Sequence, residues 1–239
     1  CTAGVLACAV LTACGDKGDS SSQTSAADTD KKFVITLYAN DAPITCENFE
    51  KLVKEKFYDG LIFHRVISGF MIQGGGYDEN LKEQKTESIK GEFAKNGFEN
   101  TLSHTRGVIS MARADYTSYS SQLTTESYNS AGSQFFIMTA DNASLDGYYA
   151  PFGKVIEGMD IVHKIEKVEV KEKESTSSSS DSSSSEQKEK STPVNDVIIS
   201  KVSVETYGVD YGKPETLDTW NYNDWVYKTY GINLNQYQQ

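Results

Sequence analysis

One short stretch, residues 63–75, combines a cation, two large apolar side chains and an amide at close spacing. Polar and apolar residues alternate on both sides of Ser68-Gly69, which predicts two β-strands joined by a turn. A fixed positive charge, a hydrophobic slot and an amide together suit an extended peptide that carries a small apolar ring. The hairpin would bring together four side chains: Arg65, Phe70, Met71 and Gln73.

This stretch resembles the signature of the cyclophilin family of peptidyl-prolyl cis-trans isomerases. Two later stretches look like further motifs of the same family in the same order. They are Gly132-Ser133-Gln134-Phe135-Phe136-Ile137, and Leu145-Asp146-Gly147 leading to Phe152-Gly153-Lys154-Val155. Three motifs in order are far more specific than one, and the resemblance runs from about Lys31 to Glu205.

The resemblance implies a reaction that needs no cofactor. Rotation about a prolyl bond meets a barrier of about 18–20 kcal/mol because amide resonance must be lost. No proton transfer, metal or nucleophile is required, and the three scattered histidines show no metal-ligand spacing. In the twisted state the proline nitrogen becomes pyramidal and gains a lone pair. A guanidinium, which is always charged, can donate to that nitrogen and to the carbonyl.

By this resemblance, Arg65 is the expected catalytic residue. The expected substrate-binding residues are Phe70, Met71, Gln73, Ala112, Arg113, Gln134, Phe136, Leu145 and Tyr149. Within this set, the residues that match the pocket for the proline ring are Phe70, Met71, Phe136 and Leu145. Those that match the groups holding the peptide are Gln73, Gln134 and the backbone near Ala112 and Arg113.

Three positions depart from the best-known members of the family. Ser144 stands where they have a tryptophan, Tyr149 where they have a histidine, and Arg113 where they have an asparagine. All three belong to the rim of the expected pocket. The departures therefore concern substrate preference and inhibitor affinity more than catalysis.

Length and charge limit the other possibilities. A chain of 239 residues fits one domain of roughly 150–200 residues with appendages. The net charge of −11 argues against a nucleic-acid partner, because binding a phosphate backbone needs a basic face. No run of about 18 apolar residues is present, so no transmembrane helix is expected.

The first residues resemble an export signal. Val5 to Leu11 is a short apolar run, and Leu11-Thr12-Ala13-Cys14 looks like a bacterial lipobox. We therefore interpret residues 1–13 as a lipoprotein signal peptide whose basic start is missing from this sequence. Cys14 would carry the lipid, and residues 14–30 would form a flexible tether. The alternative is an ordinary signal with a coincidental cysteine.

The rest of the chain predicts one mainly β domain over residues 31–206, expected by resemblance to be an eight-stranded antiparallel β-barrel closed by two α-helices. Phe33 to Tyr38 and Val197 to Glu205 are expected strands, and Thr45 is expected to cap a helix that ends near Lys56. A Ser/Lys/Glu-rich insertion at about 169–192 should be disordered. The aromatic, Asn-rich extension 207–239 has no assigned role.

The predicted function is isomerisation of X–Pro bonds in unfolded or surface polypeptides by a monomeric enzyme. The leader places that enzyme outside the cytoplasm, lipid-anchored to the bacterial cell membrane. One alternative is a proline-binding scaffold lipoprotein with little turnover. Another makes the extension after Tyr207 the functional part and the barrel its carrier.

Overall fold

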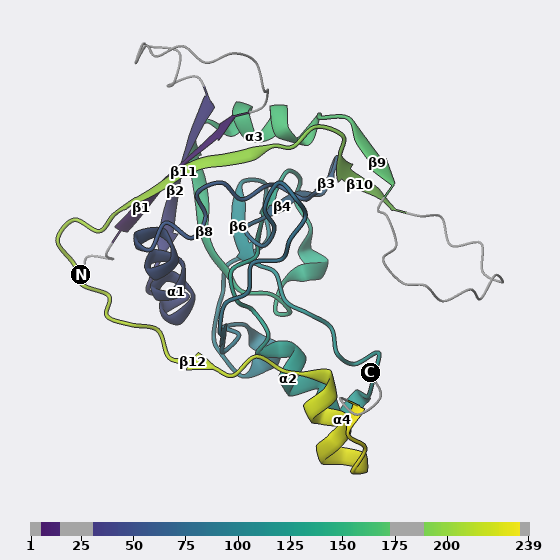
Figure 1. Ribbon diagram of the computed structural model, residues 1–239. Coiled ribbons are helices and arrows are strands. Elements are labelled where there is room, and N and C mark those ends of the chain that lie inside the picture. Colours follow the sequence, from purple (N-terminus) through teal and green to yellow (C-terminus); the bar gives the residue numbers. More distant parts are fainter. Residues whose placement is uncertain (1–5, 15–30, 173–188, 235–239) are drawn as a thin grey trace.

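One large antiparallel sheet dominates the computed structural model, which describes residues 6–14, 31–172 and 189–234 (Figure 1). Its strand order is β11-β1-β2-β8-β6-β7-β4-β3, and two small sheets pair β9 with β10 and β5 with β12. The strands are β1 (Leu6–Cys14), β2 (Lys32–Tyr38), β3 (Arg65–Ile67), β4 (Met71–Gly74), β5 (Ser88–Ile89), β6 (Val108–Met111), β7 (Phe135–Met138), β8 (Pro151–Glu157), β9 (Val170–Glu172), β10 (Lys190–Pro193), β11 (Ile198–Glu205) and β12 (Thr216–Leu217). The helices are α1 (Pro43–Lys54), α2 (Thr124–Tyr128), α3 (Met159–Glu166) and α4 (Tyr222–Tyr230).

The mainly β, antiparallel prediction is confirmed, but the sheet is not closed as a barrel. Within the described part of the chain, the end strands β3 and β11 share no ladder. The segment before β3 makes instead one isolated bridge, between Ile62 and Ile198. Hydrogen bonds from Phe63 N to Val197 O (2.9 Å) and from Gly60 N to Ile199 O (2.8 Å) flank it. Gly60, at the start of this segment, has φ +86°, a conformation that favours glycine.

The main core lies between the sheet and α1. Phe49 of α1 is fully buried, and its ring packs against three other buried rings at centroid distances of 5.1, 5.9 and 5.4 Å: Tyr58, Phe135 and Phe152. The inward-facing residues of β2, which alternate along the strand, complete this layer: Phe33, Ile35 and Leu37.

The start of α1 differs from the sequence prediction. The helix begins at Pro43, and Thr45 lies in its first turn rather than at the cap. The buried carboxylate of Glu92 satisfies the free donors of this turn. It accepts from the backbone N–H groups of Ile44 (3.0 Å) and Thr45 (2.8 Å) and from the Thr45 hydroxyl (2.7 Å). A partner 47 residues away replaces the local cap.

The segment predicted as a leader contributes a strand. β1 pairs antiparallel with β2, from Leu6 opposite Tyr38 to Thr12 opposite Lys32. On its other edge it pairs with β11, from Cys8 opposite Glu205 onward. Lipid attachment at Cys14 stays a prediction. In the described ranges, no helix is long and apolar enough to span a bilayer.

The ends of the predicted insertion are ordered strands. β9 and β10 form a two-stranded sheet that lies beside β3 (Figure 1). Its register is irregular at the buried Ser191, since Lys190 lies opposite Glu172 but Thr192 lies opposite Lys171. The middle of the insertion, residues 173–188, lies outside the described residues.

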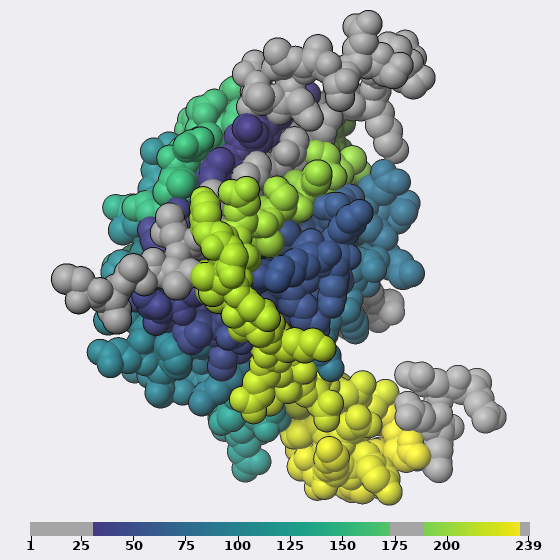
Figure 2. Space-filling model, turned by 90° about the vertical axis from the view of Figure 1, so that its left-hand side faces the viewer, coloured from purple at the N-terminus to yellow at the C-terminus, as the bar shows by residue number. Residues whose placement is uncertain are grey.

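The C-terminal extension packs against the domain. Figure 2 shows it running down one face of the molecule to the lobe formed by α4. β12 pairs with β5, and the Trp220 ring stacks on Tyr116 at 4.2 Å between centroids and on Tyr119 at 5.7 Å. The Asn221 side chain caps α4 by accepting from Asp224 N (3.1 Å). The extension is therefore fastened to the loop that follows β6.

Trp220→Ala should loosen this attachment. An aromatic pair contributes about 0.5–1.5 kcal/mol beyond the area that it buries, and Trp220 makes several such contacts. We expect cleavage within residues 207–234 to become about tenfold faster or more in limited proteolysis followed by mass spectrometry. Tyr227→Ala, at a 58% exposed position of α4 in the same extension, is the control and should cleave like the wild type. Equal cleavage rates in all three proteins would contradict the prediction.

Candidate active site

The hairpin of β3 and β4 presents three of the predicted site residues on one face. Arg65 lies opposite Gln73, and Ile67 lies opposite Met71. The intervening pair, Val66 and Ile72, is buried in the main core. Because successive side chains of a strand point to opposite faces, Arg65, Met71 and Gln73 share the face turned away from that core.

The turn of this hairpin is held from outside. Gly69 adopts φ +74°, a conformation that favours glycine, and its N–H donates to Glu166 Oε1 of α3 at 2.6 Å. His163 Nδ1 lies 2.7 Å from the other carboxylate oxygen. Partial burial alone would raise the pKa of Glu166. The hydrogen bonds with Gly69 and His163 act in the opposite direction and outweigh it, so the net shift is downward. An ionised carboxylate thus fixes the turn that places Phe70 and Met71.

A second, smaller apolar cluster forms the floor of a pocket beside the hairpin. Its buried members are Met71, Val108, Phe136 and Met138. The pocket has a volume of about 250 Å³ and is lined by Arg65, Phe70, Met71, Gln73, Ala112, Arg113, Phe136, Leu145 and Tyr149. The structure therefore brings the expected catalytic residue and eight of the nine expected substrate-binding residues to one cavity.

The guanidinium of Arg65 is the only formal charge that reaches this pocket from β3 or β4. Its Nη1 lies 3.4 Å from Gln73 Oε1 and 3.9 Å from Met71 Sδ. Its Nε and Nη2 each lie 2.8 Å from a carboxylate oxygen of Glu189. No local pattern in the sequence could have indicated Glu189, because it lies 124 residues further along the chain.

Gln134, the remaining expected residue, lines an adjoining pocket of about 350 Å³. The two pockets share Gln73, Ala112 and Arg113, and Gln73 Nε2 donates to Gln134 Oε1 at 3.0 Å. Trp220 of the C-terminal extension also lines the second pocket. The amide pair thus stands between the two cavities.

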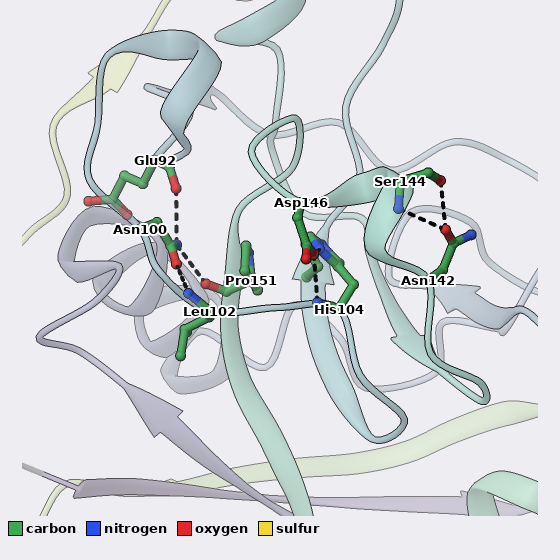
Figure 3. A network of polar contacts seen from close by, with 9 residues as sticks. Glu92, Asn100, Leu102, His104, Asn142, Ser144, Asp146 and Pro151 are labelled. Carbon is green, nitrogen blue, oxygen red and sulfur yellow. Dashed lines mark hydrogen bonds and ion pairs between the residues drawn. The ribbon is translucent and has the colours of Figure 1, made fainter.

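The rim residues have local partners of their own. Arg113 Nε donates to Tyr148 O at 3.0 Å, and its guanidinium lies 4.8 Å from the centroid of the Tyr149 ring. The exposed Ser144 donates its hydroxyl to Asn142 Oδ1 at 2.6 Å (Figure 3). Ser144 does not line the first pocket. Of the three departures from the family pattern, Arg113 and Tyr149 line the pocket, but none belongs to its buried floor.

His104, isolated in the sequence, supports the pocket from beneath. Its ring stacks on Phe136 with 6.0 Å between centroids and 14° between planes. Its Nδ1 lies 2.8 Å from Asp146 Oδ1 (Figure 3). Its Nε2 lies 3.0 Å from Ser110 Oγ. Burial lowers the pKa of His104, although Asp146 acts in the opposite direction. A neutral ring that donates from Nδ1 and accepts at Nε2 satisfies both neighbours.

This lowered pKa predicts a loss of stability in mild acid. The unfolded chain binds a proton near the usual histidine pKa of about 6.5, whereas the folded protein resists protonation. The stability contributed by the neutral ring is complete above pH 6.5. It is lost as the pH falls toward the lowered pKa, at up to about 1.4 kcal/mol per pH unit. His104→Gln should remove this part of the slope in urea denaturation between pH 7 and 5. Parallel slopes for both proteins would contradict it.

The site has the properties that rotation about a prolyl bond requires. The apolar floor suits a small ring, and Arg65 places a permanent charge at its edge. The amides of Gln73 and Gln134 can bond to peptide groups. Within the described ranges, no three His, Cys, Asp or Glu residues are grouped as metal ligands.

Comparisons with known proteins identify the family. The chain matches the family model described as cyclophilin type peptidyl-prolyl cis-trans isomerase/CLD over residues 23–204. A peptidyl-prolyl cis-trans isomerase of Acinetobacter baylyi is 51% identical over 140 residues, which cover 56% of this chain and 66% of the relative. Peptidyl-prolyl cis-trans isomerase B of Escherichia coli is 38% identical over 180 residues, 72% of this chain and 92% of the relative.

The fold agrees with a solved structure. A crystal structure of a cyclophilin-type isomerase of Cryptosporidium parvum superposes with a TM-score of 0.57 at 21% identity, covering 84% of this chain and 98% of that one. At this identity the likeness concerns the fold alone. Together with the family match, it leads to one conclusion. The chain belongs to the cyclophilin-type peptidyl-prolyl cis-trans isomerases, enzymes that need no cofactor.

Proposed function

We propose that this protein isomerises X–Pro bonds in exported or surface polypeptides while anchored to the bacterial cell membrane by a lipid on Cys14. The observation that carries the catalytic part is the pocket in which Arg65 borders an apolar floor. The observation that supports the anchored part is the sequence Leu11-Thr12-Ala13-Cys14 followed by a polar stretch. Uncatalysed prolyl isomerisation takes tens to hundreds of seconds, so polypeptides that fold after export would benefit from a catalyst of this step.

A protease-coupled assay on a short X–Pro peptide tests the catalytic part. The expected result is a rate of cis-to-trans conversion that rises in proportion to enzyme concentration. The alternative, a proline-binding scaffold with little turnover, predicts saturable peptide binding without acceleration. Binding without turnover would therefore reject the proposal in favour of the scaffold.

Anchoring has its own test, in cells of a bacterial host. The wild-type protein should be recovered in the membrane fraction with an acylated Cys14 as its first residue. Cys14→Ala should leave the chain unprocessed or release it from the membrane. Cys46→Ala is the matched control, because Cys46 is buried in the core, and this variant should still be lipidated. A mature wild-type protein that carries an unmodified Cys14 would contradict the anchor.

A further inference from the structure

We propose that Glu189 is a positioning residue for Arg65. Its carboxylate holds one edge of the guanidinium, so that the other edge stays turned toward the pocket. The inference rests on the proposed catalytic role of Arg65. It adds a residue outside the three motifs to the machinery of the site.

The contact is a two-point ion pair. Glu189 Oε1 accepts from Arg65 Nε and Glu189 Oε2 accepts from Arg65 Nη2, both at 2.8 Å. Paired, charge-assisted hydrogen bonds of this length fix orientation as well as distance, because the guanidinium is a planar fork. A single contact would leave Arg65 free to swing about it, but two contacts prevent this.

Glu189 lies behind Arg65 as seen from the pocket. Among the described residues, those that line the first pocket do not include Glu189. Nη1 faces Met71 Sδ and Gln73 Oε1, and both of these residues line it. A guanidinium has five N–H groups, and Glu189 uses two of them. The two N–H groups on Nη1 and the second one on Nη2 are not bound by Glu189, and Nη1 lies 3.4 Å from Gln73 Oε1. The ion pair therefore leaves the substrate-facing edge available.

The position of Glu189 is set by the small sheet of β9 and β10. Glu189 directly precedes β10, which lies beside β3. The register of this sheet shifts between Lys190 and Thr192, and the intervening Ser191 is buried. Such irregularities redirect side chains and are common next to active sites. The insertion thus supplies an ordered acid to the catalytic arginine.

An arginine that is already held needs less ordering during the reaction. Its side chain is long, and fixing it is entropically costly. A donor oriented before the reaction stabilises the twisted state without that cost. The pocket for the ring remains when Glu189 is lost. We therefore expect Glu189 to affect kcat and to leave KM nearly unchanged.

The alternative to positioning is that the Glu189 carboxylate slows the reaction. It offsets part of the guanidinium charge, and it could compete with the substrate carbonyl for Arg65. Under that reading, removing the charge would accelerate the reaction. The sign of the change therefore separates positioning from competition.

The experiment compares Glu189→Gln with the wild type in the full chain. We expect kcat to fall by about tenfold, since small misplacements of catalytic groups have effects of that order or larger. KM should change by less than about twofold. The Nε–H resonance of Arg65 in ¹⁵N NMR should shift and exchange faster with water, because its carboxylate partner is gone. Glu189→Asp, which keeps the charge, should recover part of kcat.

Glu172→Gln is the matched control. Glu172 is the last residue of β9 and lies opposite Lys190, the residue after Glu189, so the variant removes the same charge close by. It should resemble the wild type in kcat, in KM and in the Arg65 resonance. Glu189 is 45% exposed at its side chain, so the fold should tolerate glutamine there, as near-ultraviolet circular dichroism can check.

Three results would overturn the inference. A kcat for Glu189→Gln that equals or exceeds the wild-type value, in a protein whose Arg65→Ala variant is impaired, rejects positioning alone. An unchanged Arg65 resonance rejects the ion pair in solution. A wild type without turnover, or an Arg65→Ala variant as active as the wild type, rejects the proposed function, and the role of Glu189 falls with it.

Discussion

Arg65→Ala should lower kcat/KM for a short X–Pro peptide by about 100- to 1,000-fold. Removing one donor that stabilises developing charge in a preorganised site costs about 2.7–4 kcal/mol in comparable enzymes. Arg65 is well placed for this role, since its Nη1 lies at the pocket beside Gln73 and Met71. No general acid or base needs to replace it, because rotation about the bond moves no proton. The loss should therefore be nearly independent of pH.

Two controls make this prediction specific. Arg106→Ala removes an exposed arginine outside both pockets and should keep wild-type activity. Arg65→Lys keeps the charge but loses the planar fork, so it should recover only part of the rate. The melting temperature of Arg65→Ala should stay near that of the wild type, because its partners are partly exposed. Wild-type turnover by Arg65→Ala would show that the assignment is wrong.

Glu92→Ala should lower the free energy of unfolding by about 3–5 kcal/mol. The carboxylate accepts three hydrogen bonds at the start of α1, from Ile44 N, Thr45 N and the Thr45 hydroxyl. Each buried donor that is left without a partner costs about 1–3 kcal/mol. Partial relief comes from removing a buried charge. Burial disfavours the ionised form of Glu92 and thereby raises its pKa. The net effect is still a large loss.

Urea denaturation at neutral pH measures this effect. Glu99→Ala, at an exposed position nearby, should change stability by less than about 0.5 kcal/mol. Glu92→Gln should fall between the two, because an amide has one acceptor oxygen and would turn its own N–H groups toward donors. A change below about 1 kcal/mol for Glu92→Ala would mean that water or another group satisfies the start of the helix.

The roles of the Glu92 and Glu189 carboxylates could not be predicted from the sequence. The pocket residues of β3 and β4 could be placed because a hairpin is local, and its alternation decides which side chains share a face. Glu92 and Glu189 act on partners 47 and 124 residues away. Only the assembled tertiary structure brings such pairs together. A sequence window around either acid shows an ordinary charged residue.

His104 and the C-terminal extension also make contacts that are distant in the sequence, so their surroundings could not be predicted from it. His104 has no chemical neighbour in the sequence, but the fold places it between Asp146, Ser110 and Phe136. The aromatic residues of the extension follow no strand or helix period that reveals their partners. Trp220 finds Tyr116 across the surface of the folded domain. Periodicity predicts the face of an element, but not the element that will cover it.

Because β1 is part of the sheet, folding of the domain and the proposed export of the chain would compete for the same residues. The residues that would direct the chain to the membrane also pair with β2 and β11. The hairpin of β1 and β2 is marginal on its own, and β11 spans Ile198–Glu205, near the end of the domain. At about 5–20 residues per second, synthesis reaches β11 only after about 10–40 s. During this interval residues 6–14, if they act as the proposed leader, would stay open to the export machinery. A chain that is completed before it is engaged would hide its own leader inside the sheet.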